Sequence, residues 1–254
     1  MKPVCLVLGA GAGIGGTAGA RFAREGYHAV LCRRSDGEGL DRLVTAIQAE
    51  GGSATGQLLN AADPDVLEEL AARTERSLGP IEVVLFNLGA QIGDRPLAAT
   101  RYKAFELGWR LATFALFRVA SAVLPHMEAR GRGTFLVTSS TAAMRGNAGQ
   151  HSHAAAMGGR RMLCQSLNAE FGPKGIHVVH VVIDGAVDAP DTLGRMLGPE
   201  RFAELRAQRG GEQDGLMRPE RIAETYLHLH RQHRSTWTHE LDLRSFGDRA
   251  WWNG

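Results

Sequence analysis

The sequence predicts an α/β fold in which a doubly wound sheet of about seven parallel strands carries helices on both faces. Short runs that are apolar along their whole length alternate with longer amphipathic stretches. Such runs are typical of parallel strands that are buried on both faces by helices. A glycine-rich turn at residues 9–16 joins the first apolar run to the first helical stretch. In this kind of fold, ligands bind beyond the carboxyl ends of the strands.

The elements follow one another without an internal repeat or a linker, so we expect a single domain over residues 1–254. The expected strands are Val4–Leu8, Ala29–Cys32, Thr55–Leu59, Ile81–Phe86, Thr134–Thr138, Ile176–Ile183 and Trp237–Leu243. The expected helices run from the glycine turn to Glu25, then over Glu38–Glu50, Pro64–Ser77, Ala104–Arg130, 151–171 and Pro219–Leu229. Proline suits the first helical turn at Pro64, and Gly172-Pro173 ends the helix 151–171.

Composition excludes several classes of partner. The 29 basic and 27 acidic residues are interspersed, which gives no footprint for nucleic acid or anionic lipid. No run approaches the roughly 18 apolar residues of a membrane span, so none is expected. The chain enters the glycine turn directly, without the cleavage pattern of a secretory signal, and we expect a cytoplasmic protein.

Cysteine and histidine patterns give no metal site and no disulfide. Cys5, Cys32 and Cys164 are odd in number and form no CxxC pair, which favours buried, reduced thiols in the cytoplasm. The ten histidines form no HExxH motif and no Cys/His cluster.

The glycine turn has the spacing of a Rossmann-type nucleotide loop. Gly11, Gly13 and Gly16 fit G-x-G-x-x-G, and Gly9, Gly13-Ile14 and Gly15 fit a second spacing, G-x-x-x-G-I-G. Backbone N–H groups in such a turn approach a pyrophosphate, and the helix N-terminus adds partial positive charge. The alternative is a close strand–helix crossing that binds nothing.

The end of the second strand predicts the nicotinamide cofactor. A carboxylate there hydrogen-bonds the ribose hydroxyl of NAD, whereas arginine accommodates the 2′-phosphate of NADP. This chain has Arg33 and Arg34 at that point and no acid before Asp36. Guanidinium groups bind phosphate through two parallel hydrogen bonds, so NADP(H) is the expected cofactor.

The spacing Gly9-x-x-x-Gly13-Ile14-Gly15 resembles the short-chain dehydrogenase/reductase family, and so do features over residues 3–243. The further matching motifs are Phe86-Asn87-Leu88-Gly89 after the fourth strand, Thr138-Ser139-Ser140 at the end of the fifth, and Gly172–Val178 before the sixth. The resemblance implies cofactor contacts from Asn87, Gly89 and Gly185. Asn60 stands where many members carry an adenine-contacting Asp, and Leu8 replaces the usual Thr of the glycine motif.

The catalytic residues depart from the family pattern. The family uses a Tyr as proton donor, a Lys four residues later that lowers the pKa of that Tyr, and a Ser 13 residues before it. Counting from Ser140 gives His153 in the Tyr position and Met157 in the Lys position, and Ala112 stands where the family has an Asn. Of these four residues only the Ser is kept.

Imidazole exchanges protons near neutral pH without the help of a cation. One hypothesis is therefore that Ser140 and His153 bind and protonate the carbonyl of a small substrate while NADPH delivers hydride. The alternatives are a catalytically inactive NADP(H)-binding homologue that acts as a regulatory or oligomer-partner protein, and a scaffold that has lost its nucleotide.

Three other charged residues near the site have two interpretations each. Arg160 and Arg161 either reach toward the cofactor ribose in place of Lys, or are solvated or interface residues. Asp184 either orients His153 or a substrate cation, or caps the loop backbone, and we prefer the cap. The Gly-rich, charged stretch at about 189–217 looks like the family's mobile substrate lid.

The resemblance also implies assembly into a homodimer or homotetramer through the helices 104–130 and 151–171. Gly158-Gly159 in the second of these helices permits close helix contact. Trp251-Trp252 suggests a C-terminal tail that packs on its own or a neighbouring subunit.

Overall fold

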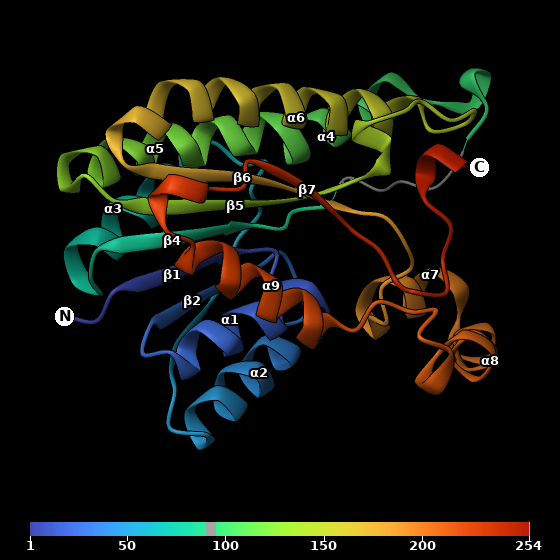
Figure 1. The fold of residues 1–254 in the computed structure, drawn as a ribbon, viewed down its shortest axis with the longest axis horizontal. Coiled ribbons are helices and arrows are strands. Elements are labelled where there is room, and N and C mark those ends of the chain that lie inside the picture. The colour runs from blue at the N-terminus through green and yellow to red at the C-terminus, as the bar shows by residue number, and fades with distance from the viewer. Residues whose placement is uncertain (90–94, 254) are drawn as a thin grey trace.

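The computed structural model describes residues 1–89 and 95–253, and it confirms the doubly wound parallel sheet. The seven strands lie in the order β3-β2-β1-β4-β5-β6-β7 and are all parallel (Figure 1). The strands are β1 Val4–Leu8, β2 His28–Arg33, β3 Ser53–Leu58, β4 Ile81–Phe86, β5 Gly133–Ser140, β6 Ile176–Ile183 and β7 Glu240–Leu243. The order reverses between β1 and β4, which is where this fold forms its ligand crevice.

Helices cover both faces of the sheet, so that two apolar cores form (Figure 1). On one face lie α1 Ile14–Arg24, α2 Gly37–Ala49 and α9 Pro219–Arg231. On the other lie α3 Val66–Ser77, α5 Ala115–Arg130 and α6 His151–Phe171, with α4 Tyr102–Trp109 leading into α5. The alternation of side chains along β1 supplies Leu6 to one core and Val7 to the other.

The stretch Tyr102–Arg130 is long and apolar enough to cross a membrane by length and composition alone. Half of its apolar window is buried inside the protein, and fully buried side chains such as Leu116 and Val119 belong to the core beside the sheet. These contacts are those of a core helix. A π-helical turn, Arg110–Phe114, interrupts the stretch between α4 and α5, and such turns are frequent at functional sites.

Several expected boundaries differ from the observed ones by one to three residues, and two of these differences have a clear structural cause. The helix expected from Pro64 begins at Val66, because Asp65 takes a left-handed backbone conformation (φ 58°) that separates Pro64 from the helix. The last strand, expected from Trp237, begins at Glu240. The indole of Trp237 instead stacks on the ring of His177 and donates a hydrogen bond to the Gln232 carbonyl, which holds this segment outside the ladder.

The expected lid is compact and mostly helical. It contains the π-helical turn Pro190–Gly194, the short α7 Arg195–Leu197 and α8 Pro199–Arg209. Figure 1 shows α7 and α8 beside the carboxyl ends of the strands, at the end of the molecule where the chain also finishes. The three cysteines are free and buried, as expected.

Candidate active site

The glycine loop brings the end of β1 against the start of α1 and leaves one side open. Gly9 has a φ of +97°, and a Cβ atom there would lie 2.6 Å from the Asn87 carbonyl oxygen. A Cβ atom at Gly15 would lie 2.2 Å from the Gly9 carbonyl oxygen. These two positions therefore require glycine for packing. At Gly11 the nearest atom to a Cβ would be Asp191 Oδ2 at 3.8 Å, so this side of the loop has room for a ligand.

One cleft of about 880 Å³ gathers the predicted site residues at the carboxyl edge of the sheet. This volume is typical of small-molecule sites. The residues predicted from the sequence that line it are Gly9, Gly11, Gly13, Ile14, Gly15, Arg33, Arg34, Asn60, Asn87, Gly89, Ser140, His153 and Gly185. The loop and the arginine pair lie at one end of it. The other end is formed by the close of β5 and the first turns of α6.

At the glycine-loop end, Arg33 is partly buried and paired with two carboxylates, whereas Arg34 is exposed. The Arg33 guanidinium lies 2.9 Å from the Asp36 carboxylate and 3.1 Å from that of Asp191. Asp36 also accepts a hydrogen bond from the Gly39 N–H at the start of α2. That backbone hydrogen bond, followed by the charge of Arg33, lowers the pKa of the Asp36 carboxyl.

The two asparagines of the cleft are engaged within the chain. Asn87 donates from Nδ2 to the Gly9 carbonyl at 3.0 Å and so ties the end of β4 to the glycine loop. Asn60 donates from Nδ2 to Asp63 at 2.7 Å and accepts from the Ala62 N–H. The structure therefore gives both side chains a structural role, while both still line the cleft.

At the other end, Ser140 and His153 meet. Ser140 is the last residue of β5, and His153 lies in the first turn of α6. Ser140 Oγ and His153 Nε2 are 3.0 Å apart, within hydrogen-bond distance. Met157, one turn further along α6, is 3% exposed, and its sulfur accepts from Ser139 Oγ at 3.8 Å. The lysine position of the family is thus filled by an apolar side chain.

Arg160 is a buried cation that the sequence did not distinguish from its neighbour. It is 2% exposed and donates to three backbone carbonyls, of Leu88, Ala112 and Thr138. Its guanidinium also lies 5.0 Å from the centre of the Phe86 ring. No carboxylate within residues 1–89 and 95–253 forms an ion pair with it, and burial lowers its pKa to about 10.

These contacts place Arg160 in the wall of the cleft, where it joins the ends of β4 and β5 to the π-helical turn through Ala112. Arg161 faces away and forms a two-pronged ion pair with Glu240 at 2.7 and 2.8 Å. Arg161 is therefore no part of the site. Arg160 and Arg161 point to different sides of α6, because each residue along a helix is rotated by about 100° from the one before it.

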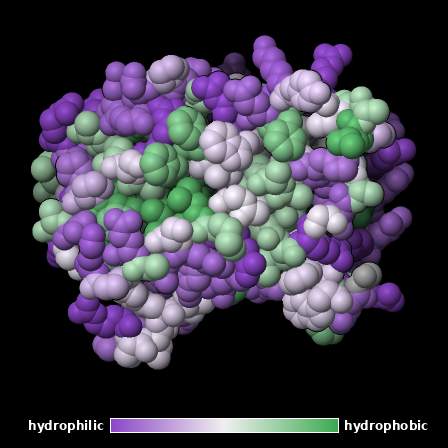
Figure 2. Space-filling model, turned by 90° about the horizontal axis from the view of Figure 1, so that it is seen from above, coloured by the Kyte–Doolittle hydropathy of each residue, from purple (hydrophilic) through white to green (hydrophobic). Residues whose placement is uncertain are grey.

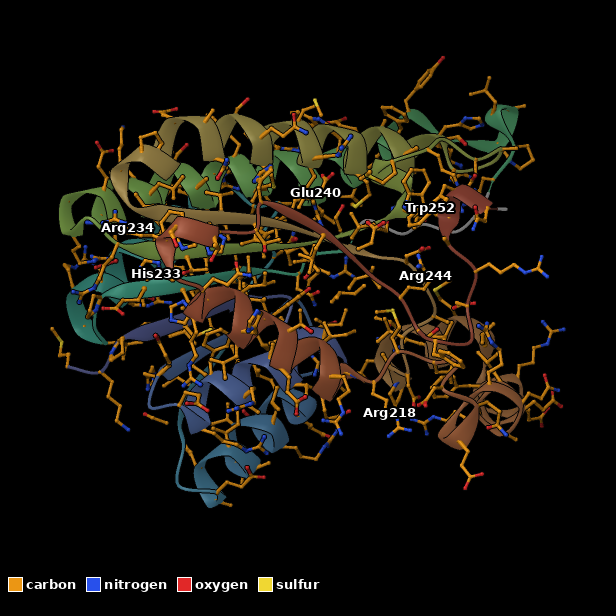
Figure 3. The ribbon with its side chains drawn as sticks, viewed as in Figure 1. Arg218, His233, Arg234, Glu240, Arg244 and Trp252 are labelled. Atoms are coloured by element: carbon orange, nitrogen blue, oxygen red, sulfur yellow. The ribbon has the colours of Figure 1, made fainter. Side chains whose placement is uncertain are left out.

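Asp184 holds the C-terminal tail. Its Oδ2 accepts hydrogen bonds from the Arg244 guanidinium at 2.9 Å and from the Trp251 N–H at 3.1 Å. Figure 3 labels Arg244 and Trp252, and the guanidinium lies 5.1 Å from the centre of the Trp252 ring. Asp184 therefore holds the C-terminal tail and does not cap its own loop as preferred from the sequence, and the tail packs on its own chain.

Asp191, in the segment expected to form a lid, contacts the glycine loop. Asp191 Oδ2 accepts a hydrogen bond from the Ala12 N–H in the glycine loop, at 3.0 Å, and another from Arg33. No sequence motif singles out Asp191, because its partners are 158 and 179 residues away along the chain.

Taken together, the sheet order, the glycine loop and the cleft at the carboxyl edge define a Rossmann-type α/β protein. The chain belongs to the short-chain dehydrogenase family, because the model of that family matches residues 3–193.

Individual relatives agree with this assignment. The short-chain reductase protein NovJ of Streptomyces niveus is 31% identical over 233 residues, which are 91% of this chain and 87% of NovJ. A short-chain dehydrogenase from Rhodopseudomonas palustris has 30% identity and a TM-score of 0.78, with 95% of this chain and 98% of that one covered. A 7α-hydroxysteroid dehydrogenase complexed with NADH and 7-oxo glycochenodeoxycholic acid has 25% identity and a TM-score of 0.81, with 95% and 92% covered.

Proposed function

We propose that the chain is an NADP(H)-dependent oxidoreductase that interconverts a small carbonyl compound and its alcohol. The observation that carries the proposal is the 3.0 Å contact of Ser140 with His153 in the cleft that also holds the glycine loop and the arginine pair. Relatives named as dehydrogenases and reductases support the reaction class.

The cofactor end of the cleft fits a dinucleotide. The open side of Gly11 and the N–H of Ala12 would take the pyrophosphate at the N-terminus of α1. Arg33 and Arg34 would hold the 2′-phosphate that distinguishes NADP(H) from NAD(H). The hydroxysteroid dehydrogenase described above binds NADH, which supports a nicotinamide cofactor of either kind, and the arginine pair favours the phosphorylated one.

When bound, the reduced nicotinamide supplies a hydride to the carbonyl carbon. The Ser140 hydroxyl donates a hydrogen bond to the carbonyl oxygen and orients it. His153, as an imidazolium, provides the proton that converts this oxygen to a hydroxyl, and the neutral ring regains a proton from solvent. Arg160 holds the cleft wall in shape through its three carbonyl contacts. In the reverse direction, neutral His153 accepts the proton of the alcohol.

Incubation of the protein with NADPH and a panel of ketones, aldehydes and enones tests the proposal. The expected result is consumption of NADPH only when a carbonyl compound is present. With NADPH deuterated at the hydride position of the nicotinamide, the deuterium should be found on the former carbonyl carbon of the alcohol product. NADPH binding without consumption across the panel would contradict it and would favour the inactive NADP(H)-binding homologue.

We propose further that the protein forms a homodimer or homotetramer through the face carrying α5 and α6. Figure 2 looks onto this face, where hydrophobic surface gathers near the centre. Trp109, Phe114 and Phe117 form an exposed stack with ring centres 5.5 and 6.5 Å apart, and Met162 of α6 is 51% exposed. Large exposed apolar patches mark interaction sites. Sedimentation should give a dimer or tetramer that Phe117→Glu weakens, and a monomeric parent protein would contradict this.

The proposed compartment is the cytoplasm. All three cysteines are free and buried, and reduced thiols are usual in that compartment. Thiol titration of unfolded protein purified without reductant should find all of them reduced, whereas a disulfide would contradict the assignment.

A further inference from the structure

A carboxylate of the lid lies where the glycine loop is built to receive a phosphate. Asp191 Oδ2 accepts from the Ala12 N–H at 3.0 Å and from the Arg33 guanidinium at 3.1 Å. It is also the nearest atom to the open side of Gly11. A backbone N–H at a helix N-terminus and a guanidinium are the donors that phosphate groups use. Asp191 therefore occupies phosphate-binding donors with an anion of the chain itself.

The chain on either side of Asp191 is anchored elsewhere. Before it, the Asp188 N–H donates to the Met217 carbonyl, and the Asp188 carboxylate accepts from Arg206 Nε at 2.6 Å. After it, Gly198 leads into α8, whose Arg209 pairs with the Asp248 carboxylate at 2.5 Å. The segment Pro190–Leu197 between these points contacts the glycine loop through Asp191. We call this segment the 190–197 turn.

We propose that Asp191 is an internal competitor for the cofactor phosphates, so that a dinucleotide binds only when the 190–197 turn releases the glycine loop. The proposal rests on the proposed NADP(H) function. Two anions cannot share the Ala12 N–H and Arg33 without repulsion in a partly buried site, where the Asp191 side chain is 24% exposed. Dissociation of Asp191 frees the Ala12 N–H and leaves Arg33 paired with Asp36 alone. NADPH gains more than NADH because its additional phosphate also needs Arg33.

Calorimetric titration of Asp191→Asn with NADPH and with NADH tests the competition. Asparagine keeps the shape and removes the charge. The expected result is about tenfold tighter binding of NADPH, which corresponds to about 1.4 kcal/mol, and a smaller gain for NADH. Glu204→Gln is the matched control: this exposed acid of α8 lies outside the turn, and its removal should leave both affinities within twofold.

Hydrogen exchange of the nucleotide-free protein gives a second readout that needs no cofactor. Asp191→Ala removes the acceptor of the Ala12 N–H, so this amide should exchange faster than in the parent protein, whereas amides within β1 should be unchanged. Equal exchange at Ala12 in both proteins would overturn the contact on which the proposal depends.

The outcomes separate this inference from the function beneath it. Dinucleotide binding by the parent protein with unchanged or weaker affinity in Asp191→Asn overturns the competition and leaves the proposed function intact. Binding by Asp191→Asn and not by the parent supports both. No binding by the parent or by either variant contradicts the proposed function and the competition with it.

Discussion

The two ends of the cleft differ in how much of the family pattern they keep. The glycine-loop end keeps its spacing at Gly9, Gly13 and Gly15, and a Cβ atom at each of these would lie less than 3.0 Å from another atom. The α6 end keeps Ser140 and has His153 and Met157 where the family has Tyr and Lys. The first end is tied to the fold, since Gly15 lies where β1 meets α1. At the second end, the side chains of Ser140, His153 and Met157 line the cleft.

The largest expected effect is on the α6 end. His153→Phe should lower turnover by at least about 100-fold, because it removes the proton donor of the Ser140 pair. Calorimetric NADPH affinity should stay within about twofold, because the phosphate contacts lie at the other end of the cleft. Unchanged turnover would show that His153 is not the proton donor.

The next largest difference is expected between the stabilities of two variants at neighbouring arginines of α6. Arg160→Met leaves three buried carbonyls without their donor and should lower the free energy of unfolding by about 2–4 kcal/mol. Arg161→Met loses a partly exposed ion pair with Glu240 and should cost about 1 kcal/mol or less. Urea unfolding of both variants measures the difference. Equal losses would mean that Arg160 does not hold the cleft wall.

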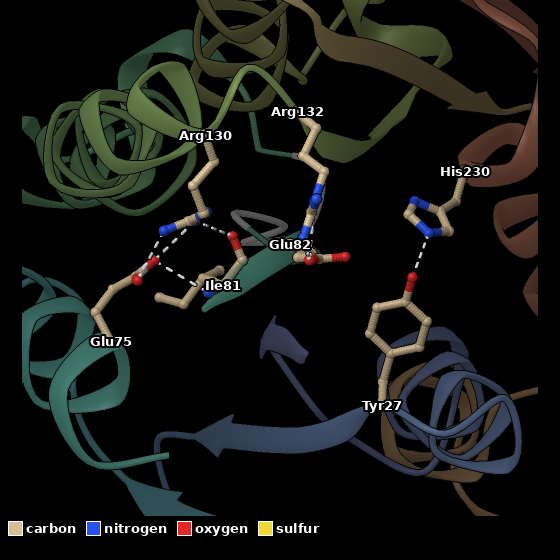
Figure 4. Close-up of polar contacts among 7 residues, drawn as sticks. All are labelled: Tyr27, Glu75, Ile81, Glu82, Arg130, Arg132 and His230. Carbon is tan, nitrogen blue, oxygen red and sulfur yellow. Dashed lines mark hydrogen bonds and ion pairs between the residues drawn. The ribbon is translucent and has the colours of Figure 1, made fainter. Parts of the chain in front are cut away.

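Acid should destabilise the fold in a pH range set by buried histidines. Burial lowers the pKa of His180 and of His230 to about 4, and Figure 4 shows His230 bonded to Tyr27. The unfolded chain protonates histidine near pH 6.5, so it binds more protons than the folded state below that pH. The free energy of unfolding should therefore fall as the pH drops from about 6.5 to 4, by about 2 kcal/mol per histidine at pH 5.

Activity and stability should be measured at the same pH values, because a loss of activity below pH 6.5 must be separated from acid unfolding. Urea unfolding at several pH values provides the correction. A free energy that is flat between pH 7 and 5 would contradict the assignment of both histidines as neutral in the fold. Replacement of one of them, His230→Gln, should reduce the slope.

The smallest expected effect is on the glycine-loop end. Arg34→Ala should raise the Kd for NADPH by about tenfold and leave that for NADH unchanged, because only NADPH carries the 2′-phosphate. Arg42→Ala removes an exposed arginine of α2 and is the matched control. An equal loss of affinity for NADPH and NADH would show that Arg34 does not bind the 2′-phosphate.

Most of the fold was predictable because its signals are local. β1, β4, β6 and α6 begin and end where the hydrophobic pattern indicates. The errors at Pro64 and Trp237 come from a left-handed residue and a ring stack, neither of which shows in hydrophobicity.

The site was predictable to the extent that motifs mark it. The predicted cofactor-binding residues, Ser140 and His153 all line the cleft, since the carboxyl ends of parallel strands meet at one edge. The different roles of Arg160 and Arg161 could not be predicted, because the sequence does not show which side of α6 faces the sheet. The contact of Asp191 with Ala12 joins residues 179 apart, and no spacing rule connects them.

We propose that this cleft keeps an NADP(H) site although its proton-transfer residues differ from those of the family. Calorimetric titration of the parent protein with NADPH and, separately, with NADH tests it most directly. We expect saturable binding of NADPH that is at least about tenfold tighter than that of NADH. Binding of neither nucleotide, or equal binding of both, would contradict it.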